Sequence, residues 1–299
     1  MIKYASDFSG IEAGVQALKL IGIPYEHVFS SELDKYARSS LLANSRPGKL
    51  YLHALDPKDQ GHSIDLYLAG PPCQSFSLAG KRLGAADPRG QLFEAALESI
   101  RSFRPKVFVL ENVRGLLSSE YWTHILETLR GFEDYFVEYR ILNTKDFGIP
   151  QNRERVYIVG IKHSCLAAPF TWPSPIESIP LLDLIDYSDL RIDPLPSKNP
   201  KILDMINTSQ AVFLNMGFRN WKPHSYRDFS PAIIANGSYW NLPMHRKASV
   251  PELLSLQGFP IDFKQVVSDT QFKKQIGNSM SVNVLEALFR QVFLATNFS

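Results

Sequence analysis

Cys73 has the setting in this sequence that is best suited to chemistry. It is one of two cysteines, and it directly follows Pro71 and Pro72 at the end of the apolar run DLYLAG. A lone cysteine is more often a small buried residue. Here the prolines fix the backbone and the polar letters QSFS follow, which favours an exposed thiol. A thiol near a positive group becomes a thiolate, so Cys73 is a candidate nucleophile.

A glutamate and two arginines accompany this cysteine. Glu111 ends the apolar run KVFVL, where a carboxylate is costly unless it is paired, exposed or used. If the two runs form neighbouring strands, Glu111 and Cys73 meet as a catalytic pair. Arg153 and Arg155 are two residues apart in QNRERVYIVG, so an extended chain points both to one side. That side would face a phosphate or a reacting base, and a salt-bridged surface strand is the alternative.

A nucleotide-type site is indicated near the N-terminus. The letters DFSGIEAG, residues 7–14, form a glycine-containing turn between an expected strand and an expected helix, and such a turn offers free N–H groups to a ligand. Glu32 follows about twenty residues later, where nucleotide-binding sheets carry an acid for ribose hydroxyls. The turn does not match G-x-G-x-x-G. A tight turn and a solvated acid are the alternatives.

The elements that position these residues alternate between strands and helices. Near-continuous apolar runs predict strands at residues 2–8, 27–32, 64–70, 106–113 and 155–161. Helical spacing of apolar residues predicts helices at residues 11–22, 34–45, 89–103 and 121–132. This alternation predicts an α/β fold with a mostly parallel sheet and helices on both faces.

The pattern changes after about residue 165. Prolines are dense from 169 to 200 and regular alternation is lost until about 243, which predicts a small loop-rich second domain. Residues 275–295 are helical again. The net charge of +2 excludes a strongly basic coat, and two cysteines are too few for a disulfide framework or a four-cysteine zinc site, so we expect no metal. We see no signal peptide and no membrane span, and therefore expect a cytoplasmic protein.

Taken together, the motifs resemble those of the DNA cytosine-5 methyltransferases of bacterial and phage restriction–modification systems. They occur in that family's order along nearly the whole chain: DFSGIEAG, SELDKYA, GPPCQSFS, GKRLGAADPRGQLF, LENV, DFGIPQNRERVYIVG, RKASVPELLSLQGFP and QIGNSMSVNV. The resemblance implies a Rossmann-like S-adenosylmethionine-dependent methyltransferase sheet with a small loop-rich target-recognition domain. It implies a catalytic domain of residues 1–168 plus 264–299, and a recognition domain and hinge of residues 169–263.

The resemblance also implies a mechanism. The target cytosine leaves the DNA stack, because its reacting atoms cannot be reached inside it. Cys73 attacks C6, Glu111 hydrogen-bonds or protonates N3, and C5 takes the methyl group from S-adenosylmethionine. Arg155 supports the base and Glu111, and Arg153 braces the site.

The cofactor site follows from the same motifs and is implied at Phe8, Gly10, Ile11, Glu32, Leu33, Pro72, Asn278 and Ser279. DNA contacts are expected at Gln74, Ser75 and Arg89. By charge and stacking they are also expected at Arg219, Arg227 and Tyr239, with Trp221 and Lys222 as further candidates and ordinary exposed loop residues as the alternative. This chain departs from the family at Glu12 and Ala13, where glycines are common. The adenine contact is left to His53 or Asp56.

The expected partner is double-stranded DNA, with a cognate restriction endonuclease in the same system and a monomeric enzyme. An alternative is a tRNA cytosine-5 methyltransferase, because one branch of this family uses the same core on tRNA. A second alternative is a catalytically silent DNA-binding regulator. The intact set of Cys73, Glu111, Arg153 and Arg155 argues against the silent alternative.

Overall fold

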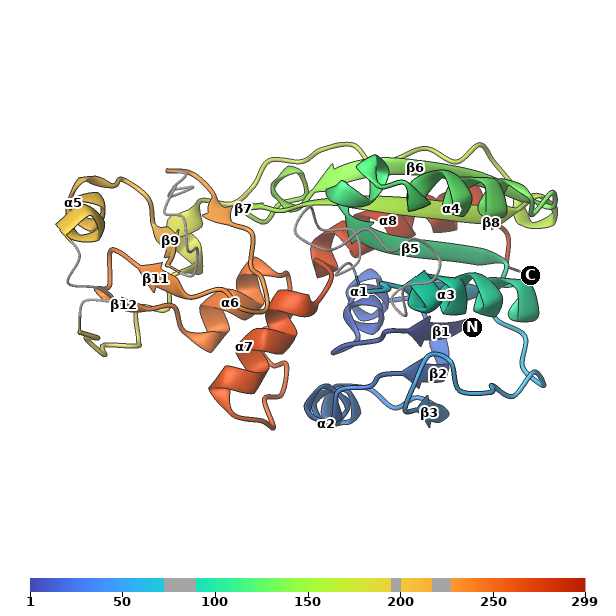
Figure 1. The fold of residues 1–299 in the computed structure, drawn as a ribbon, viewed down its shortest axis with the longest axis horizontal. Coiled ribbons are helices and arrows are strands. Elements are labelled where there is room, and N and C mark those ends of the chain that lie inside the picture. Colours follow the sequence, from blue (N-terminus) through green and yellow to red (C-terminus); the bar gives the residue numbers. More distant parts are fainter. Residues whose placement is uncertain (73–89, 195–199, 217–226, 299) are drawn as a thin grey trace. The chain divides into compact units, whose positions relative to one another are not determined.

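A computed structural model describes residues 1–72, 90–194, 200–216 and 227–298 (Figure 1). The chain forms two compact units. The sheet unit consists of Met1–Leu142, Glu154–Ser174 and Leu285–Ser299, and the loop-rich unit consists of Asn143–Arg153 and Pro175–Val284. The expected functional division at 168/169 and 263/264 stays a prediction, since compactness alone does not show where a functional domain begins.

The sheet unit is built on a seven-stranded sheet of order β3-β2-β1-β4-β5-β8-β6. The strands are β1 (Ile2–Asp7), β2 (Tyr25–Ser31), β3 (Lys49–Tyr51), β4 (Leu66–Ala69), β5 (Val107–Val113), β6 (Tyr135–Asn143) and β8 (Glu154–Lys162). The pairs β1–β2, β2–β3, β1–β4 and β4–β5 are parallel, while β5–β8 is antiparallel. The chain order reverses between β1 and β4, and such switch points are where open sheets bind ligands, at the carboxyl ends of the strands.

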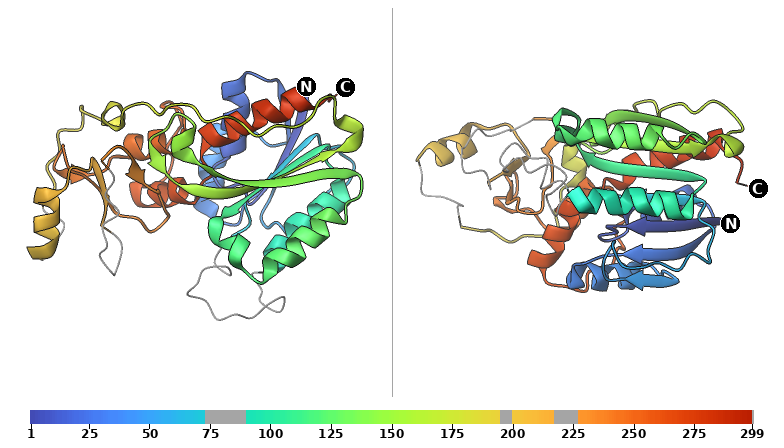
Figure 2. Two further views of the ribbon diagram at one scale, coloured as in Figure 1. Left: turned by 90° about the horizontal axis from the view of Figure 1, so that it is seen from above. Right: turned by 45° about the vertical axis from the view of Figure 1, so that its right-hand side comes forward.

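Helices cover both faces of this sheet, as the sequence predicted. Figure 2 shows α1 and α8 on one face and α3 and α4 on the other. The helices of the unit are α1 (Ala13–Ile21), α2 (Lys35–Asn44), α3 (Gly90–Phe103), α4 (Tyr121–Arg130) and most of α8 (Val282–Ala295). Single turns of 3₁₀ helix lie at Arg114–Ser118 and His163–Cys165. Asp34 caps α2 by accepting the N–H groups of Tyr36 and Ala37.

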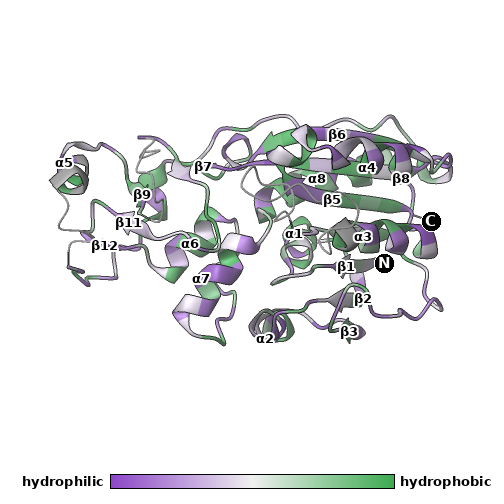
Figure 3. Ribbon diagram, in the orientation of Figure 1, coloured by the Kyte–Doolittle hydropathy of each residue, from purple (hydrophilic) through white to green (hydrophobic). Residues whose placement is uncertain are grey.

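The core of the sheet unit lies between β4, β5 and β8 and the helices α3 and α4. Phe108, Leu110 and Ile158 from the strands pack with Ala96 and Ile100 of α3, and all five are buried. Figure 3 shows apolar residues along β5 and a mixture of apolar and polar residues on α3. This is the amphipathic pattern that predicted the helix, because a helix on a sheet buries one stripe only. A well-packed core of this kind fixes the strand ends that carry the site.

The loop-rich unit has little regular structure. Its helices are α5 (Pro200–Thr208), α6 (Val250–Leu256) and α7 (Asp269–Asn278), with 3₁₀ turns at Thr144–Asp146 and Leu181–Leu184. Its strands are β7 (Gln151–Asn152), β9 (Phe213–Asn215), β10 (Ser230–Pro231), β11 (Tyr239–Asn241) and β12 (Arg246–Lys247). β9, β11 and β12 form an antiparallel sheet, and β7 pairs with β10. The stretch 275–295 is two helices rather than one, because Ser279 is extended and ends α7.

A buried ion pair holds the loops of this unit together. Arg246 and Glu252 are both fully buried, and the guanidinium donates to the two carboxylate oxygens at 2.8 and 3.0 Å. The same guanidinium donates to the carbonyls of Asp186 and Asp189 at 2.8 and 3.0 Å. A buried pair is tolerated when hydrogen bonds satisfy it in this way.

None of the helices in the described part of the chain combines the length and apolar composition that a membrane span needs.

Candidate active site

The turn after β1 lies open at the carboxyl edge of the sheet. Phe8 and Gly10 both have a φ of 55°, and a Cβ added at Gly10 would meet nothing within 4 Å. There is thus free space directly above Gly10. The predicted residue Ile11 is buried, so its side chain packs inward and only its backbone can face a ligand.

Glu32 lies beside this turn, as the sequence predicted from its position after β2. Its carboxylate accepts the N–H of Gly10 at 2.7 Å and the N–H of Asp34 at 2.8 Å. Burial raises the pKa of Glu32 above its ordinary value, although these two hydrogen bonds act in the opposite direction. A carboxylate has about four acceptor sites, so lone pairs remain for the hydroxyl groups of a ligand. Leu33 is 68% exposed next to it and offers an apolar surface.

The two candidates for the adenine contact hydrogen-bond within their own loop. Asp56 accepts the N–H of His53 at 2.8 Å, and His53 Nδ1 accepts the N–H of Leu55 at 3.0 Å. Their side chains therefore shape the loop after β3. Neither is selected over the other by these contacts.

Glu111 and Arg155 form a shielded ion pair on β5 and β8. Val113 pairs with Arg155 across the two antiparallel strands, so Glu111 and Arg155 are diagonal neighbours on one face. Arg155 Nε lies 3.2 Å from Glu111 Oε1, and the two side chains are only 16% and 11% exposed. Glu111 Oε1 has no hydrogen bond from the described residues. The pair thus presents a charged, incompletely hydrogen-bonded acid at the strand end.

The chain that leads to Cys73 is fixed beside Glu111. Ala69 of β4 pairs with Leu110 of β5, and the Asn112 side chain donates to the Pro71 carbonyl at 3.0 Å. Pro72, the following residue, is exposed. Five predicted residues lie outside the described residues: Cys73, Gln74, Ser75, Arg89 and Arg219. Trp221 and Lys222 lie outside them as well.

The second predicted arginine, Arg153, belongs to the loop-rich unit and has different partners. Its guanidinium is buried and donates to the carbonyls of Ile233 at 2.6 Å and Ser279 at 2.8 Å. Arg153 therefore connects β7 with two later segments of its own unit. Of the two predicted cofactor residues there, Asn278 is exposed at the end of α7 and Ser279 is buried.

Two buried glutamines that were not predicted from the sequence organise the same region. Gln151 donates to Gln257 Oε1 at 2.8 Å and accepts the N–H of Ile233 at 2.8 Å. Gln257 donates to the carbonyls of Ile276 and Ser279 at 2.9 and 3.0 Å. Both stand inside the quoted motifs, in QNRER and in LQGFP. A glutamine within an apolar stretch such as ELLSLQGF is the signal that could have identified Gln257.

The DNA-contact candidates of the described chain differ in exposure. Arg227 is exposed. Tyr239 is buried, and its hydroxyl donates to the Ala232 carbonyl and accepts the N–H of Ile234, both at 2.7 Å. The structure thus gives Tyr239 the role of closing its own loop, and its contact with DNA stays a prediction.

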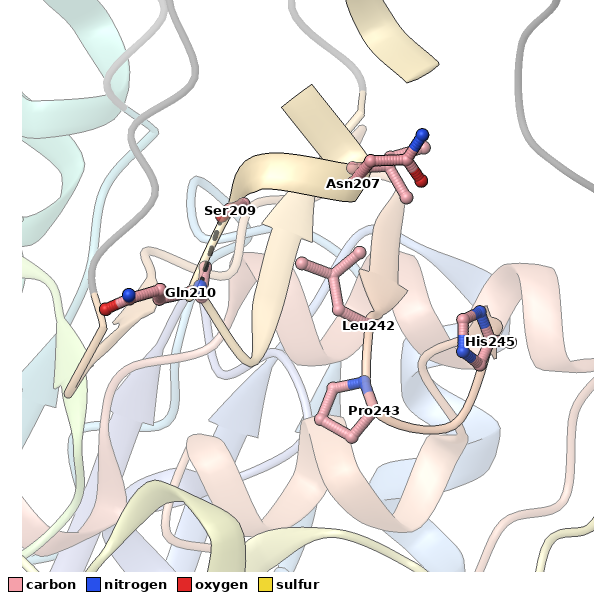
Figure 4. A pocket seen from close by; sticks show the side chains of 8 residues that line it. Asn207, Ser209, Gln210, Leu242, Pro243 and His245 are labelled. Atoms are coloured by element: carbon pink, nitrogen blue, oxygen red, sulfur yellow. Dashed lines mark hydrogen bonds between the residues drawn. The ribbon is translucent and has the colours of Figure 1, made fainter. Parts of the chain in front are cut away.

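The loop-rich unit also has a hollow that no sequence pattern indicated. It has a volume of about 360 Å³ and is lined by the end of α5 and by the turn after β11 (Figure 4). Asn207 and Gln210 bring side-chain amides to its rim, while Leu242 and Pro243 supply apolar surface. Side-chain amides are a common means of reading adenine edges, which makes these two residues candidates for base contacts.

The fold and the site together define a class. An acid and a glycine turn at the switch point of a Rossmann-like sheet, next to a shielded acid–arginine pair, are the features of an enzyme that binds a nucleotide-like cofactor. Two solved structures share this fold. A DNMT2 variant of Spodoptera frugiperda has a TM-score of 0.71 at 19% identity, covering 98% of this chain and 100% of its own. The Dnmt2 methyltransferase of S. pombe has a TM-score of 0.69 at 21% identity, covering 98% of each chain.

Sequence comparison defines the family. The model of the C-5 cytosine-specific DNA methylases matches residues 2–294. Type II methyltransferase M.NgoBI of Neisseria gonorrhoeae is 39% identical over 87% of this chain and 84% of its own. Type II methyltransferase M.HaeII of Haemophilus aegyptius is 34% identical over 97% of this chain and 91% of its own. The chain belongs to the C-5 cytosine-specific DNA methylase family and is an S-adenosylmethionine-dependent DNA cytosine-5 methyltransferase.

The residues of the sheet unit fit this cofactor. The open space above Gly10 admits a ligand, and Glu32 has remaining acceptor sites for ribose hydroxyls. The exposed side chain of Leu33 offers an apolar surface to an adenine ring. When bound, S-adenosylmethionine supplies an activated methyl group.

Proposed function

We propose that this enzyme methylates cytosine within one short DNA sequence, with Cys73 as the nucleophile and Glu111 as the residue that binds the base. The observation that supports this assignment most strongly is the shielded pair of Glu111 and Arg155 beside the fixed backbone at Pro71. Cys73 follows two residues after that fixed point. An acid held by a cation next to an incoming nucleophile is the arrangement that addition to a pyrimidine ring requires.

Each residue then has a defined task. The Cys73 thiolate forms a bond to C6 of the flipped-out cytosine, and Glu111 gives a hydrogen bond or its proton to N3, which takes up the negative charge that develops there. C5 thereby becomes nucleophilic and receives the methyl group. Water takes the C5 proton, and the electron pair of that C–H bond expels the Cys73 thiolate from C6. This restores the aromatic ring and returns the N3 proton to Glu111. Arg155 is the positioning residue that holds the Glu111 carboxylate, and Arg153 holds the segment before β8.

Recognition of the DNA sequence is assigned to the loop-rich unit. Arg227 is exposed and cationic, which suits a phosphate or guanine contact, and Asn207 and Gln210 suit base edges. The two relatives named above are type II methyltransferases. By analogy we infer a cytoplasmic monomer that belongs to a restriction–modification system, with a cognate endonuclease as its partner.

The match to the C-5 cytosine-specific DNA methylase family favours DNA over tRNA as the substrate. The ion pair at Glu111 argues against the catalytically silent alternative, because a regulator has no need to keep a shielded carboxylate at a strand end.

The test is conversion sequencing of DNA for 5-methylcytosine. Wild type and Cys73→Ser are expressed in a host that lacks cytosine methylation, and host tRNA is sequenced in parallel. We expect 5-methylcytosine in one short DNA motif with the wild type alone. Methylation with Cys73→Ser would contradict the assigned nucleophile. Methylated tRNA with unmethylated DNA would contradict the DNA substrate.

A further inference from the structure

Glu12 occupies the turn that leads into α1. Its φ is 64°, a left-handed conformation that is unfavourable for a residue with a side chain. Yet it is only 1% exposed, and its carboxylate points inward beneath the cofactor turn. The strained backbone and the buried charge both cost folding free energy, so interactions with the surrounding residues must offset that cost.

Four polar side chains supply that compensation. The Ser6 and Ser30 hydroxyls each donate to Glu12 Oε1 at 2.6 Å, and the Tyr4 hydroxyl donates to Oε2 at 3.0 Å. His27 Nε2 lies 3.4 Å from Oε1 and 2.8 Å from the Ser30 hydroxyl. Burial raises the pKa of Glu12, but the charge on His27 and these hydrogen bonds outweigh it and hold the pKa below its usual value.

An irregularity in β2 makes this cluster geometrically feasible. Residues three apart on a regular strand point to opposite faces. Between Tyr4 and Ala5 of β1 the paired residue moves from His27 to Phe29, so Val28 is an extra residue in β2. Such a bulge changes the alternation, and His27 and Ser30 therefore reach the same carboxylate.

The cluster connects directly to the residues that face the cofactor. Besides donating to Glu12, the Ser6 hydroxyl lies 2.7 Å from the hydroxyl of Ser9, and the Ser9 hydroxyl donates to the Ser6 carbonyl at 3.2 Å. The Ser9 hydroxyl in turn accepts the N–H of Ser31, and Gly10 donates its own N–H to Glu32. A displacement of Glu12 would therefore pass through Ser6 and Ser9 to the open turn.

We propose that Glu12 is a positioning residue for S-adenosylmethionine: its buried carboxylate anchors β1 and β2 through Tyr4, Ser6 and Ser30, and so fixes the turn at Ser9 and Gly10. A glycine at this position would adopt the same backbone without strain, but it would have no side chain with which to make this anchor. This role of Glu12 concerns cofactor binding alone and does not depend on the DNA sequence that is recognised.

Calorimetric titration with S-adenosylhomocysteine, at a temperature where each variant is folded, tests the proposal. The variants are Glu12→Gln, which keeps the shape of the side chain, and Glu12→Gly, which removes the side chain and relieves the backbone strain. Losing hydrogen bonds to a charged group should weaken binding by about tenfold or more in Glu12→Gly and by less in Glu12→Gln. The KM for DNA should stay unchanged. Glu26→Gln, exposed on β2 next to His27, is the matched control and should bind like the wild type.

A purely structural role gives a different result. It would lower the melting temperature of Glu12→Gly while the folded protein kept wild-type affinity, and that outcome would overturn the proposal. If Glu12→Gly does not fold, the affinities of Ser30→Ala and Glu12→Gln for S-adenosylhomocysteine test the positioning role instead. Ser30→Ala removes only one of the hydrogen-bond donors to Glu12. We expect Ser30→Ala to weaken cofactor binding by about threefold. Wild-type affinity in both variants would refute the positioning role.

Discussion

Removing the cation beside Glu111 is the most informative perturbation of the site. In Arg155→Ala the Glu111 carboxylate loses its one ion-pair partner among the described residues. In Arg155→Lys a charge remains, but the planar guanidinium that reaches across from β8 is lost. Arg114→Ala is the matched control, because Arg114 and Glu154 form an exposed ion pair at 2.8 Å with side chains that are 64% and 43% exposed.

The expected magnitude follows from distance and burial. At 3.2 Å and an effective dielectric constant of about 20, two unit charges interact by about 5 kcal/mol, which desolvation partly offsets. Breaking a shielded pair on one side costs about 3–5 kcal/mol of folding stability. The exposed pair at Arg114 should contribute less than about 1 kcal/mol. Because Glu111 must also be held against the base, we expect the rate of methyl transfer in Arg155→Ala to fall by about 10²- to 10³-fold.

Two assays separate the effect of Arg155→Ala on the rate of methyl transfer from its effect on stability. Single-turnover methyl transfer, with enzyme in excess over DNA, measures the chemical step, and urea unfolding measures stability. The double variant Arg155→Ala with Glu111→Gln should recover most of the lost stability without recovering the rate, because no buried charge is left unpaired. A rate for Arg155→Ala within threefold of the control variant would refute the reasoning.

Three further predictions concern other parts of the chain. Glu32→Ala should weaken S-adenosylhomocysteine binding in calorimetry by about tenfold or more while DNA binding is retained, since a charged acceptor is lost. Because the pKa of Glu12 is lowered on folding, its carboxylate stabilises the protein above the reference pKa of 4.5. The unfolding free-energy difference between wild type and Glu12→Gln should therefore be largest near neutral pH and shrink as the pH falls below that value. Gln257→Leu should lower the unfolding free energy by about 2–4 kcal/mol in urea, against little change in the exposed control Gln265→Leu.

Strand ends were the most predictable part of the site. Glu32 and Glu111 follow apolar runs whose length and composition identify strands, and the structure confirms both strands. Neighbouring carboxyl ends of parallel strands meet at one edge of a sheet. The hydrogen bond from Asn112 to Pro71 was not predictable, because it depends on the register of β4 against β5.

Features that depend on tertiary contacts could not be predicted from the sequence. The sequence gives no sign that Glu12 is buried. Its partners come from two strands, and Ser30 reaches it only because of the bulge at Val28. The break between α7 and α8 was also missed, because Ile276, Met280 and Val284 keep a helical spacing of apolar residues across Ser279. Its extended conformation is fixed by Arg153 and Gln257, which bind its carbonyl from distant segments.

The most direct test of the central claim is covalent trapping of Cys73 on its target base. DNA with 5-fluorocytosine at the methylated position is incubated with the enzyme and S-adenosylmethionine, and the product is digested and analysed by mass spectrometry. Fluorine at C5 cannot leave as a proton does, so the release of the thiolate is blocked. If Cys73 is the nucleophile, we expect a stable adduct on the peptide that contains Cys73 and no adduct with Cys73→Ser. An adduct on another residue, or the same adduct with Cys73→Ser, would contradict it.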